Sequence, residues 1–412
     1  MTYERKIIND PVHGFISIPR GLIYDLVRHP LLQRLQRIKQ LGLSAVVYPG
    51  AQHTRFQHSL GTYHLVSQAV GHLTARGQFI FDSEAEAVMA AALLHDVGHG
   101  PFSHVLEHTL TRGVDHEDLS LLLMERINRE IGGQLSLAIR IFRDNYPKHF
   151  LHQLVSGQVD MDRLDYLRRD SFYTGVSEGT VGTARLIEML DVKDDRLVVE
   201  AKGIYSLEQL LTARRLMYWQ VYLHKTSVAY ERMLISTLLR AKELAACGAD
   251  LFASPALAYF LTHEVSRETM TDDPRCLEHF IHLDDNDVWT SLKVWCAHPD
   301  RVLSTLSQGM VNRWTFKVER SDTPAPQQRL DQLAVSIGKQ LGISTELAAR
   351  YLVSTTDIAQ RMYDPADDSI DVIYRDGTTR SIAEASDMLS LPTLSKMVKK
   401  HYLCYWRPHD RS

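Results

Sequence analysis

Apolar residues recur at helical spacing through the first half of the chain. Between Leu22 and Leu41 they stand three to five residues apart, and Pro30 divides this stretch into two expected helices because proline interrupts a helix. The same kind of pattern predicts five further helices, at residues 58–76, 84–97, 117–130, 134–145 and 157–170. The first half of the chain is therefore expected to form a helical core.

A longer helical pattern runs from Ser206 to Ala246 and contains no proline. Ser206 is the expected N-cap, because Gln209 stands three residues further on, as in a capping box. The pattern predicts one long helix through the middle of the fold.

The second half of the chain mixes helical and strand-like patterns. Short runs of strand-forming residues occupy residues 196–200, 313–319, 369–374 and 378–382, and the Asp376-Gly377 pair between the last two predicts a hairpin. Residues 321–328 (SDTPAPQQ) indicate a surface linker before a helix that begins near Arg329. We expect a mainly α protein, with a helical catalytic domain at 1–245 and a smaller α+β region at 246–412 that serves oligomerisation or regulation.

Composition narrows the functional classes. With 46 basic and 50 acidic residues the net charge is -4, so a strong field for nucleic acid or an anionic membrane is not expected. The four cysteines have no CxxC spacing, which argues against a zinc knot or a disulfide framework. Neither a signal peptide nor an apolar run long enough to span a bilayer occurs, so a cytoplasmic protein with no membrane partner is expected.

Histidines are concentrated in one segment. Nine of the 20 lie between His53 and His116, and LLHDVGHGPFSH places three of them around an acid. The apolar run before His95 and Asp96 would hold this pair on a rigid helix, where imidazole and carboxylate suit a divalent ion. A single histidine such as His72 is better explained as an ordinary core or surface residue.

An acidic stripe follows on a later helix. Asp162, Asp165, Tyr166 and Asp170 fall at i, i+3, i+4 and i+8, so three carboxylates share one face. Their repulsion needs a cation or hydroxyl donors in compensation, although a solvated face would also explain Asp165.

A basic and aromatic stripe occupies the long helix expected at 206–246. Arg214, Tyr218, Tyr222 and Lys225 fall at i, i+4, i+8 and i+11, a pattern suited to phosphate and base contacts. An ordinary amphipathic helix is the alternative explanation, above all for Tyr218.

The motifs RFQHSLGTYHL, LLHDVGHGPFSH, DHED and DMDRLDYLRRD follow the order His, His-Asp, Asp. In this the chain resembles the HD superfamily, and specifically the SAM-and-HD-domain dNTP triphosphohydrolases and their bacterial relatives. The likeness extends from NDPVHG at Asn9 to about Glu231, with a weaker echo at NRWTFKVE near residue 313 and no SAM module before it. It implies that the helical domain is an HD-domain bundle.

The resemblance implies one divalent metal ion held by two imidazoles and two carboxylates: His58, His95, Asp96 and Asp162. Manganese, iron, zinc, nickel or magnesium would suit such ligands, and further magnesium would accompany a triphosphate. In an alternative arrangement, His99 and His104 recruit a second ion.

The substrate implied by the resemblance is a dNTP, cleaved at the α-phosphorus to deoxynucleoside and triphosphate. Arg55, Arg163 and Arg214 match a triphosphate clamp. The implied sugar pocket and remaining substrate contacts are Gln40, Leu41, His99, Tyr166, Asp170, Tyr218 and Tyr222.

His116 and His104 are the expected proton-transfer residues, with Glu107 and Glu117 as partners that orient an imidazole. His116 is favoured as general acid, because the resemblance places it beside the leaving oxygen. Glu107 stands where relatives carry an aspartate.

Two other functions compete with this hypothesis. One is cleavage of dinucleotides or ppGpp-like nucleotides by a related HD phosphodiesterase or pyrophosphohydrolase. The other is a non-catalytic protein that senses nucleotides or binds single-stranded nucleic acid, which the complete ligand set disfavours.

The resemblance also implies a homodimer or homotetramer and a nucleotide activator. Animal relatives recognise a guanine activator with an acid and an arginine near the N-terminus, where this chain carries Arg28 and Gln36. Arg28 has no hydrogen-bond acceptor for a guanine edge, although Arg313 and Lys317 retain a basic pair. We therefore expect a different activator or none.

Overall fold

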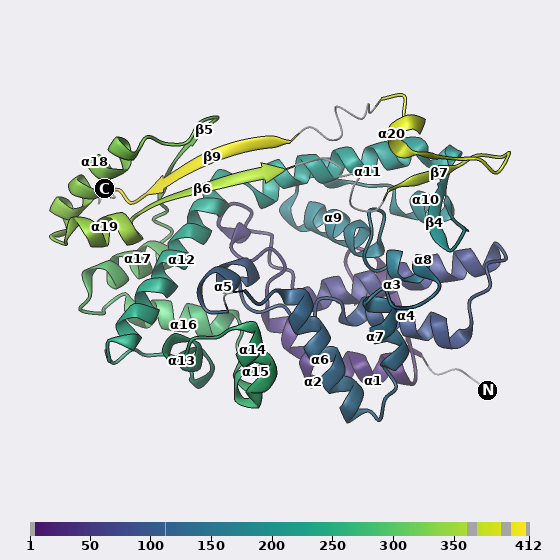
Figure 1. The fold of residues 1–412 in the computed structure, drawn as a ribbon, viewed down its shortest axis with the longest axis horizontal. Coiled ribbons are helices and arrows are strands. Elements are labelled where there is room, and N and C mark those ends of the chain that lie inside the picture. Colours follow the sequence, from purple (N-terminus) through teal and green to yellow (C-terminus); the bar gives the residue numbers. More distant parts are fainter. Residues whose placement is uncertain (1–4, 112, 361–368, 389–396, 409–412) are drawn as a thin grey trace.

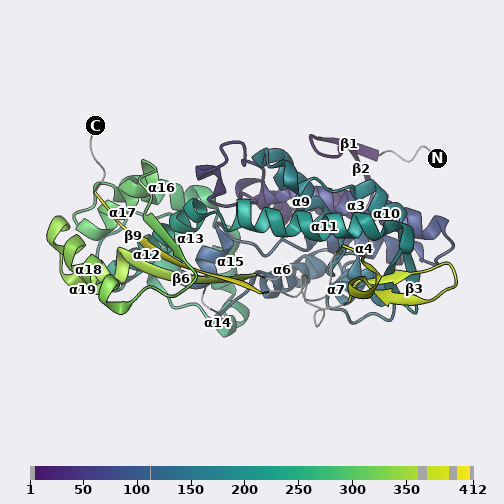
Figure 2. The same ribbon diagram turned by 90° about the horizontal axis from the view of Figure 1, so that it is seen from above.

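The computed structural model describes residues 5–111, 113–360, 369–388 and 397–408. Helices dominate this part of the chain, with small sheets around them, as Figures 1 and 2 show. The mainly α fold class is confirmed. None of the described helices is long and apolar enough to cross a membrane.

The chain begins with an antiparallel hairpin of β1 (Arg5–Asp10) and β2 (Gly14–Pro19), which the sequence analysis missed. Two short helices follow, α1 (Leu22–Arg28) and α2 (Pro30–Gln33), so the break expected at Pro30 is confirmed. The second of these helices is shorter than predicted. After one 3-10 turn the backbone becomes extended at Ile38, and residues 38–54 form a connection that contains a short 3-10 turn at Ser44–Val46.

The five helical patterns of the HD segment all correspond to helices. They are α3 (Arg55–Ala75), α4 (Asp82–Leu94), α6 (His116–Glu130), α7 (Ser136–Phe142) and α9 (Met161–Thr174). Helix α3 packs against both α4 and α9. Three shorter helices escaped prediction: α5 (Ser103–Thr109), α8 (His149–Gln153) and α10 (Thr183–Glu188).

The single long helix expected from Ser206 to Ala246 is wrong. Helix α11 (Ile204–Met217) passes into a π-helical turn at Tyr218–Tyr222, and α12 (Lys225–Ala246) starts afresh after it. Gly203 is the N-cap of α11, so Ser206 lies inside the helix, and the His224 side chain caps α12 by accepting from the Thr226 amide. Because the π turn shifts the helical register, the residues from Arg214 to Lys225 do not form one α-helical stripe.

A four-stranded sheet joins distant parts of the chain. Its order is β3 (Leu190–Lys193), β4 (Arg196–Glu200), β7 (Asp371–Ile373) and β8 (Thr379–Ser381), with β4 and β7 parallel. The predicted strand at 196–200 and the β7–β8 hairpin are confirmed. Gly377, at φ +81°, lies in the turn between the two strands of this hairpin, and the short helix α20 (Ile382–Ala385) follows β8. This sheet contains strands from both sides of residue 245. The expected division into domains at 1–245 and 246–412 stays a prediction.

Several elements of the rest of the second half pack against α12. Its helices are α13 (Pro255–Thr262), α14 (Arg267–Asp272), α15 (Pro274–Ile281), α16 (Asp285–Trp295), α17 (Arg301–Val311), α18 (Gln327–Leu341) and α19 (Thr345–Tyr351). A three-stranded sheet places β9 (Val398–Tyr405) between β5 (Lys317–Ser321) and β6 (Val353–Gln360). The strand predicted to begin at Arg313 starts four residues later, because Arg313 has a left-handed backbone, φ 59°.

Candidate active site

Four side chains converge at the centre of the HD segment, from α3, from α9 and from the turn that follows α4. The Nε2 atoms of His58 and His95 lie 3.2 Å apart, and Asp162 Oδ1 lies 2.8 Å from the first and 3.4 Å from the second. Asp96 Oδ2 lies 3.8 Å from His58 Nε2, and its Oδ1 lies 3.5 Å from His95 Nε2. The four expected ligands are therefore close together.

The orientation of both imidazoles fits a metal ion. His58 Nδ1 lies 2.7 Å from Asp165 Oδ2, and His95 Nδ1 lies 2.7 Å from the Ala92 carbonyl oxygen. Each Nδ1–H thus has an acceptor, which leaves the Nε2 lone pair directed toward the cluster. Burial lowers the pKa of His58, but hydrogen bonds to Asp162 and Asp165 outweigh it and raise this pKa to about 10. The carboxylates of this cluster stabilise a positive charge between them, and a divalent ion would supply that charge.

Asp165 lies behind the metal ligands rather than in the cavity. Its Oδ1 is 2.6 Å from His13 Nε2. Arg169 donates to Asp165 Oδ2 through Nε at 2.8 Å and to Asp165 Oδ1 through Nη2 at 2.9 Å. Arg169 Nη1 also donates to Asp10 Oδ2 at 2.8 Å. Although burial raises the pKa of Asp165, the Arg169 guanidinium and its hydrogen bonds hold it well below the usual range. Asp10, His13 and Arg169 support His58 indirectly, a role for which the sequence offered only the NDPVHG motif.

We expect Gly61→Ala to disrupt this support. A Cβ at Gly61 would stand 1.9 Å from Asp165 Oδ1 and 2.4 Å from Arg169 Nη2, and both groups are fully buried. Overpacking of this kind costs about 1–3 kcal/mol of unfolding free energy, measurable by urea denaturation. Gly71→Ala, on the same helix with no atom within 4 Å of its Cβ, is the matched control and should stabilise by about 0.5–1 kcal/mol. Equal midpoints for the two variants would contradict the assignment.

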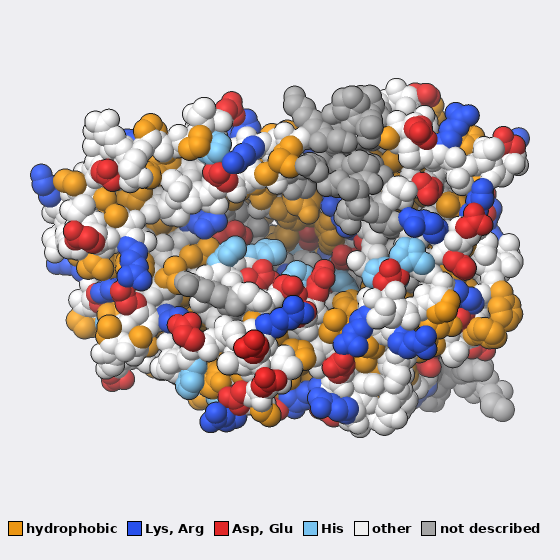
Figure 3. Space-filling model, viewed as in Figure 1, with side chains coloured by type: hydrophobic (Ala, Val, Ile, Leu, Met, Phe, Trp, Pro, Cys, Tyr) orange, Lys and Arg blue, Asp and Glu red, His pale blue; other side chains and the backbone are white. Residues whose placement is uncertain are grey.

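A cavity of about 370 Å³ opens beside the metal cluster. Among the predicted site residues, those that line it are Gln40, Leu41, Arg55, His58, Asp96, His99, His104, His116, Asp162, Tyr166, Asp170, Tyr218 and Tyr222. Figure 3 shows a hollow near the middle of one face, with histidine side chains around it. His95, Glu107, Glu117, Arg163 and Arg214 are not in this lining.

His116, the first residue of α6, is oriented by Glu107. Its Nδ1 lies 3.2 Å from Glu107 Oε1, and its ring stacks on that of His99 with centroids 4.0 Å apart. Although burial lowers the pKa of His116, the Glu107 hydrogen bond and the charge of Asp96 raise it. Glu117 is exposed on the same helix and lies outside the cavity lining. Of the two candidate partners, the structure brings Glu107 to His116.

The neighbouring histidine, His99, has a different environment. Its Nδ1 lies 2.7 Å from Ser103 Oγ and its Nε2 lies 3.2 Å from Asp96 Oδ1. Burial, aided by the Arg55 charge, lowers the pKa of His99 to about 3. His99 is therefore a neutral hydrogen-bonding residue beside the metal cluster.

His104 lies at the cavity mouth, with 73% of its side chain exposed and Nδ1 3.4 Å from Glu107 Oε2. Among the described residues, the group of three or more potential ligands within 4.8 Å of one another consists of His58, His95 and Asp162. It includes neither His99 nor His104, so the geometry favours the one-ion arrangement.

An acid and two tyrosines form the wall assigned to the sugar. Asp170 is buried, its Oδ1 lies 2.7 Å from His53 Nε2, and its Oδ2 accepts from the Tyr222 hydroxyl at 2.7 Å. The Tyr166 ring lies beside that of Tyr222, with centroids 6.1 Å apart. His53, which stacks on Tyr173, was not predicted, because no motif connects it to Asp170.

Two of the three arginines expected in a triphosphate clamp face other groups. Arg163 donates through Nε to the Gly157 carbonyl at 2.6 Å and to Asp160 at 3.0 Å, while Arg214 donates to Gln158 at 3.2 Å. Arg55 lines the cavity and donates to Asp96 at 2.6 Å. The structure thus places one of the three guanidiniums in the cavity wall.

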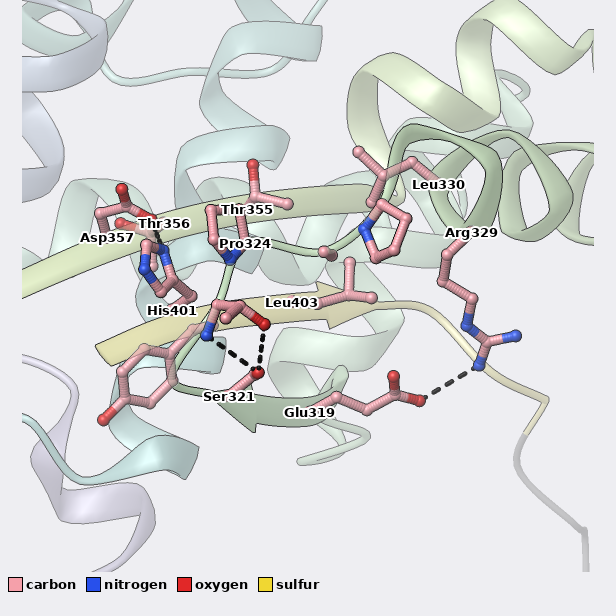
Figure 4. Close-up of a pocket in the computed structure, with 14 residues that line it drawn as sticks. Glu319, Ser321, Pro324, Arg329, Leu330, Thr355, Thr356, Asp357, His401 and Leu403 are labelled. Atoms are coloured by element: carbon pink, nitrogen blue, oxygen red, sulfur yellow. Dashed lines mark hydrogen bonds and ion pairs between the residues drawn. The ribbon is translucent and has the colours of Figure 1, made fainter. Parts of the chain in front are cut away.

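A larger cavity of about 530 Å³ lies between the three-stranded sheet and residues 321–330 (Figure 4). Its charged groups are already paired: Arg329 lies 3.2 Å from Glu319, and His401 Nδ1 lies 2.6 Å from Asp357 Oδ1. With these charges neutralised, it lacks the open ligand set of the cavity at His58.

Comparisons with known proteins identify the family to which this segment belongs. The chain matches the family model of the HD domain over residues 55–170 and that of an HD-associated region over residues 181–253. It is 32% identical to the uncharacterized protein YwfO of Bacillus subtilis, across 93% of this chain and 88% of that protein. It is 33% identical to the deoxynucleoside triphosphate triphosphohydrolase SAMHD1 homolog of Dictyostelium discoideum, across 58% of this chain. The matched part spans half the length of that relative.

A solved structure supports the same relationship. The crystal structure of a phosphohydrolase from Bacteroides thetaiotaomicron superposes with a TM-score of 0.96 at 70% identity, covering 98% of this chain and all of that one. A hypothetical protein from Aquifex aeolicus, 27% identical, superposes with a TM-score of 0.69 and covers 98% of this chain and 96% of that one. The fold is therefore shared over nearly the whole chain.

Proposed function

The chain belongs to the HD-domain phosphohydrolase superfamily, and on that basis we propose that it hydrolyses deoxynucleoside triphosphates to deoxynucleoside and inorganic triphosphate. The observation that carries this proposal is the composition of one continuous cavity wall. That wall contains three of the four metal-ligand candidates, an arginine, a histidine that Glu107 orients from behind, and an acid that accepts from a hydroxyl. A substrate with a phosphate chain, a scissile P–O bond and a sugar hydroxyl matches all of these groups.

In this proposal, different residues act on different parts of the substrate. His58, His95, Asp96 and Asp162 would hold a divalent ion, which would supply Lewis-acid polarisation of a phosphate oxygen and a more acidic water. Arg55 binds and neutralises a phosphate oxygen beside it. His116, held by Glu107, donates a proton to the leaving sugar oxygen.

Asp170 and Tyr166 hold the deoxyribose. Although Asp170 accepts from both His53 and Tyr222, each carboxylate oxygen has a further lone pair for the 3′-hydroxyl of the sugar. Gln40 belongs to the same wall, and its Oε1 is buried without a hydrogen-bond partner in the described chain. Both residues therefore retain acceptor capacity for a ligand.

Product analysis tests this function. Purified protein would be incubated with manganese or magnesium and with each dNTP and rNTP, followed by chromatography of nucleosides and detection of free triphosphate. Deoxynucleoside and triphosphate in equal amounts are expected. Pyrophosphate and a monophosphate, or cleavage of dinucleotides alone, would assign the site to a related HD pyrophosphohydrolase or phosphodiesterase.

Metal content provides a further prediction. We expect elemental analysis to find about one transition-metal ion per chain, because two neutral imidazoles favour such ions over calcium. After removal by a chelator, manganese supplied at ten times its Kd should restore about 1.4 kcal/mol of unfolding free energy. His95→Ala is the control and should show no such gain. If it keeps both the ion and the stabilisation, the ligand assignment is wrong.

Assembly and regulation follow from the same proposal. A homodimer or homotetramer remains a prediction, and so does the expectation of a different nucleotide activator or none. Arg28 and Gln36 are both exposed, on α1 and on the 3-10 turn after α2, and Gln36 donates to Gln33. Arg313, of the expected basic pair, donates to the Val46 carbonyl at 3.0 Å.

A further inference from the structure

One acidic residue in the cavity wall has no role in the chemistry described above. Glu231 lies in the second turn of α12 and faces the cavity together with His104 and Val105 of α5. Its side chain forms no hydrogen bond or ion pair with any residue that the structure describes. The adjacent guanidinium of Arg232 points elsewhere, donating to Thr356 Oγ1 on β6 at 2.6 Å.

The other acids in the same lining all have partners. Asp96 accepts from Arg55 at 2.6 Å, Asp162 lies 2.8 Å from His58 Nε2, and Asp170 is held by His53 and Tyr222. Among the described acids in this lining, Glu231 is thus the one whose carboxylate has no partner within the chain. Burial raises the pKa of Glu231 to about 7, although His104 and Arg232 oppose the shift. A carboxylate left unpaired in such a wall costs free energy that donors on a ligand would recover.

The position of Glu231 indicates which part of a nucleotide it would meet. A carboxylate repels phosphate, and the phosphate-binding groups come from α3, α4 and α9 rather than from α12. The sugar is assigned to Asp170 and Tyr166 on α9. The part of the cavity wall formed by α12 and α5 is therefore left to contact the nucleobase. Leu43 and Phe102, which line the same cavity, add apolar surface.

We propose that Glu231 recognises the nucleobase by accepting hydrogen bonds from N–H groups on its edge, and that it favours guanine. This inference rests on the proposed function. Guanine presents a ring N–H and an amino group side by side, which match the two oxygens of a carboxylate. Thymine presents one ring N–H flanked by two carbonyl oxygens, and these oxygens repel a carboxylate. Glu231 is thereby a specificity residue and takes no part in bond cleavage.

The test compares kcat/KM for dGTP and dTTP in the parent protein and in Glu231→Gln. Charged hydrogen bonds of this kind correspond to roughly 10- to 150-fold in affinity, so the parent should favour dGTP by about that factor. In Glu231→Gln we expect the ratio to fall at least about tenfold, through a higher KM for dGTP, with kcat for dTTP within about threefold of the parent. Glu231→Asp should retain the direction of the preference.

Glu264→Gln is the matched control, because it removes an 85% exposed carboxylate outside the cavity lining. It should leave the ratio unchanged. An unchanged ratio in Glu231→Gln, or an equal loss for both nucleotides, would overturn the assignment. If the parent cleaves no dNTP, the proposed function fails. Equilibrium binding of dGTP and dTTP, with and without Glu231→Gln, then decides the role of Glu231 separately, since equal affinities would refute it.

Discussion

Replacing His116 with alanine is expected to lower kcat for dNTP hydrolysis roughly 10²- to 10⁴-fold, the usual contribution of general acid catalysis. His116 is positioned for this role by Glu107 and by its stacking on His99, and it is not one of the metal ligands. The variant should therefore bind the same amount of metal as the parent, as elemental analysis can verify. A kcat within about threefold of the parent would remove His116 from the proton-transfer step.

The pH dependence gives an independent check of the same residue. A general acid works in its protonated form, so activity should fall as pH rises through the pKa of His116. Although burial lowers that pKa, Glu107 and Asp96 raise it, which extends the active range to higher pH. In Glu107→Gln the alkaline limb of kcat/KM should move to lower pH, because a carboxylate partner is lost. Glu117→Gln, which changes an exposed acid on the same helix, should leave this limb in place.

Deoxyribose should be preferred over ribose by roughly 5- to 150-fold, before any steric clash is added. Leu41 and Tyr222 line the cavity, and in the proposed binding mode a 2′-hydroxyl beside them would lose water without gaining a partner. The measurement is kcat/KM for dGTP against GTP. Equal values in the parent would contradict the sugar-pocket assignment and favour the other nucleotide substrates.

The role of Tyr222 can be tested with two substitutions, because its ring and its hydroxyl make different contacts. Its ring forms part of the wall, and its hydroxyl donates to Asp170 at 2.7 Å. Tyr222→Ala removes both and should reduce the discrimination against GTP. Tyr222→Phe keeps the ring, so it should retain the discrimination while weakening the support of Asp170. If the two variants lose discrimination equally, the hydroxyl rather than the ring excludes ribose.

Local periodicity was sufficient to predict the longer helices of the HD segment, and the motif resemblance predicted that its candidate ligands come together. Apolar spacing located α3, α4, α6 and α9, and the resemblance assigned His58, His95, Asp96 and Asp162 to one site. The helix predictions succeeded because this information is local, whereas the grouping of the four residues depended on the family resemblance. A helix face follows from spacing within about ten residues, and the His-Asp pair is adjacent in sequence.

The partners of these residues depended on the tertiary structure. Spacing placed Asp165 on the same stripe as Asp162 and Asp170, yet Asp165 meets His13, 152 positions away, and orients His58. His53 reaches Asp170 across 117 positions. No periodic pattern encodes such pairs, because they arise only when separate helices pack together.

The amino-acid sequence by itself determined the fold class, and its motifs identified the candidate metal ligands and the residue types at the cavity. Only the tertiary structure decided that Glu107 rather than Glu117 meets His116, that Arg163 faces Asp160, and that a π turn interrupts the long helix. The physical reason is that spacing specifies which side chains share a face. What lies opposite that face depends on how the elements pack. It also depends on local irregularities of the backbone, such as the π turn, which the helix propensities of the residues do not predict.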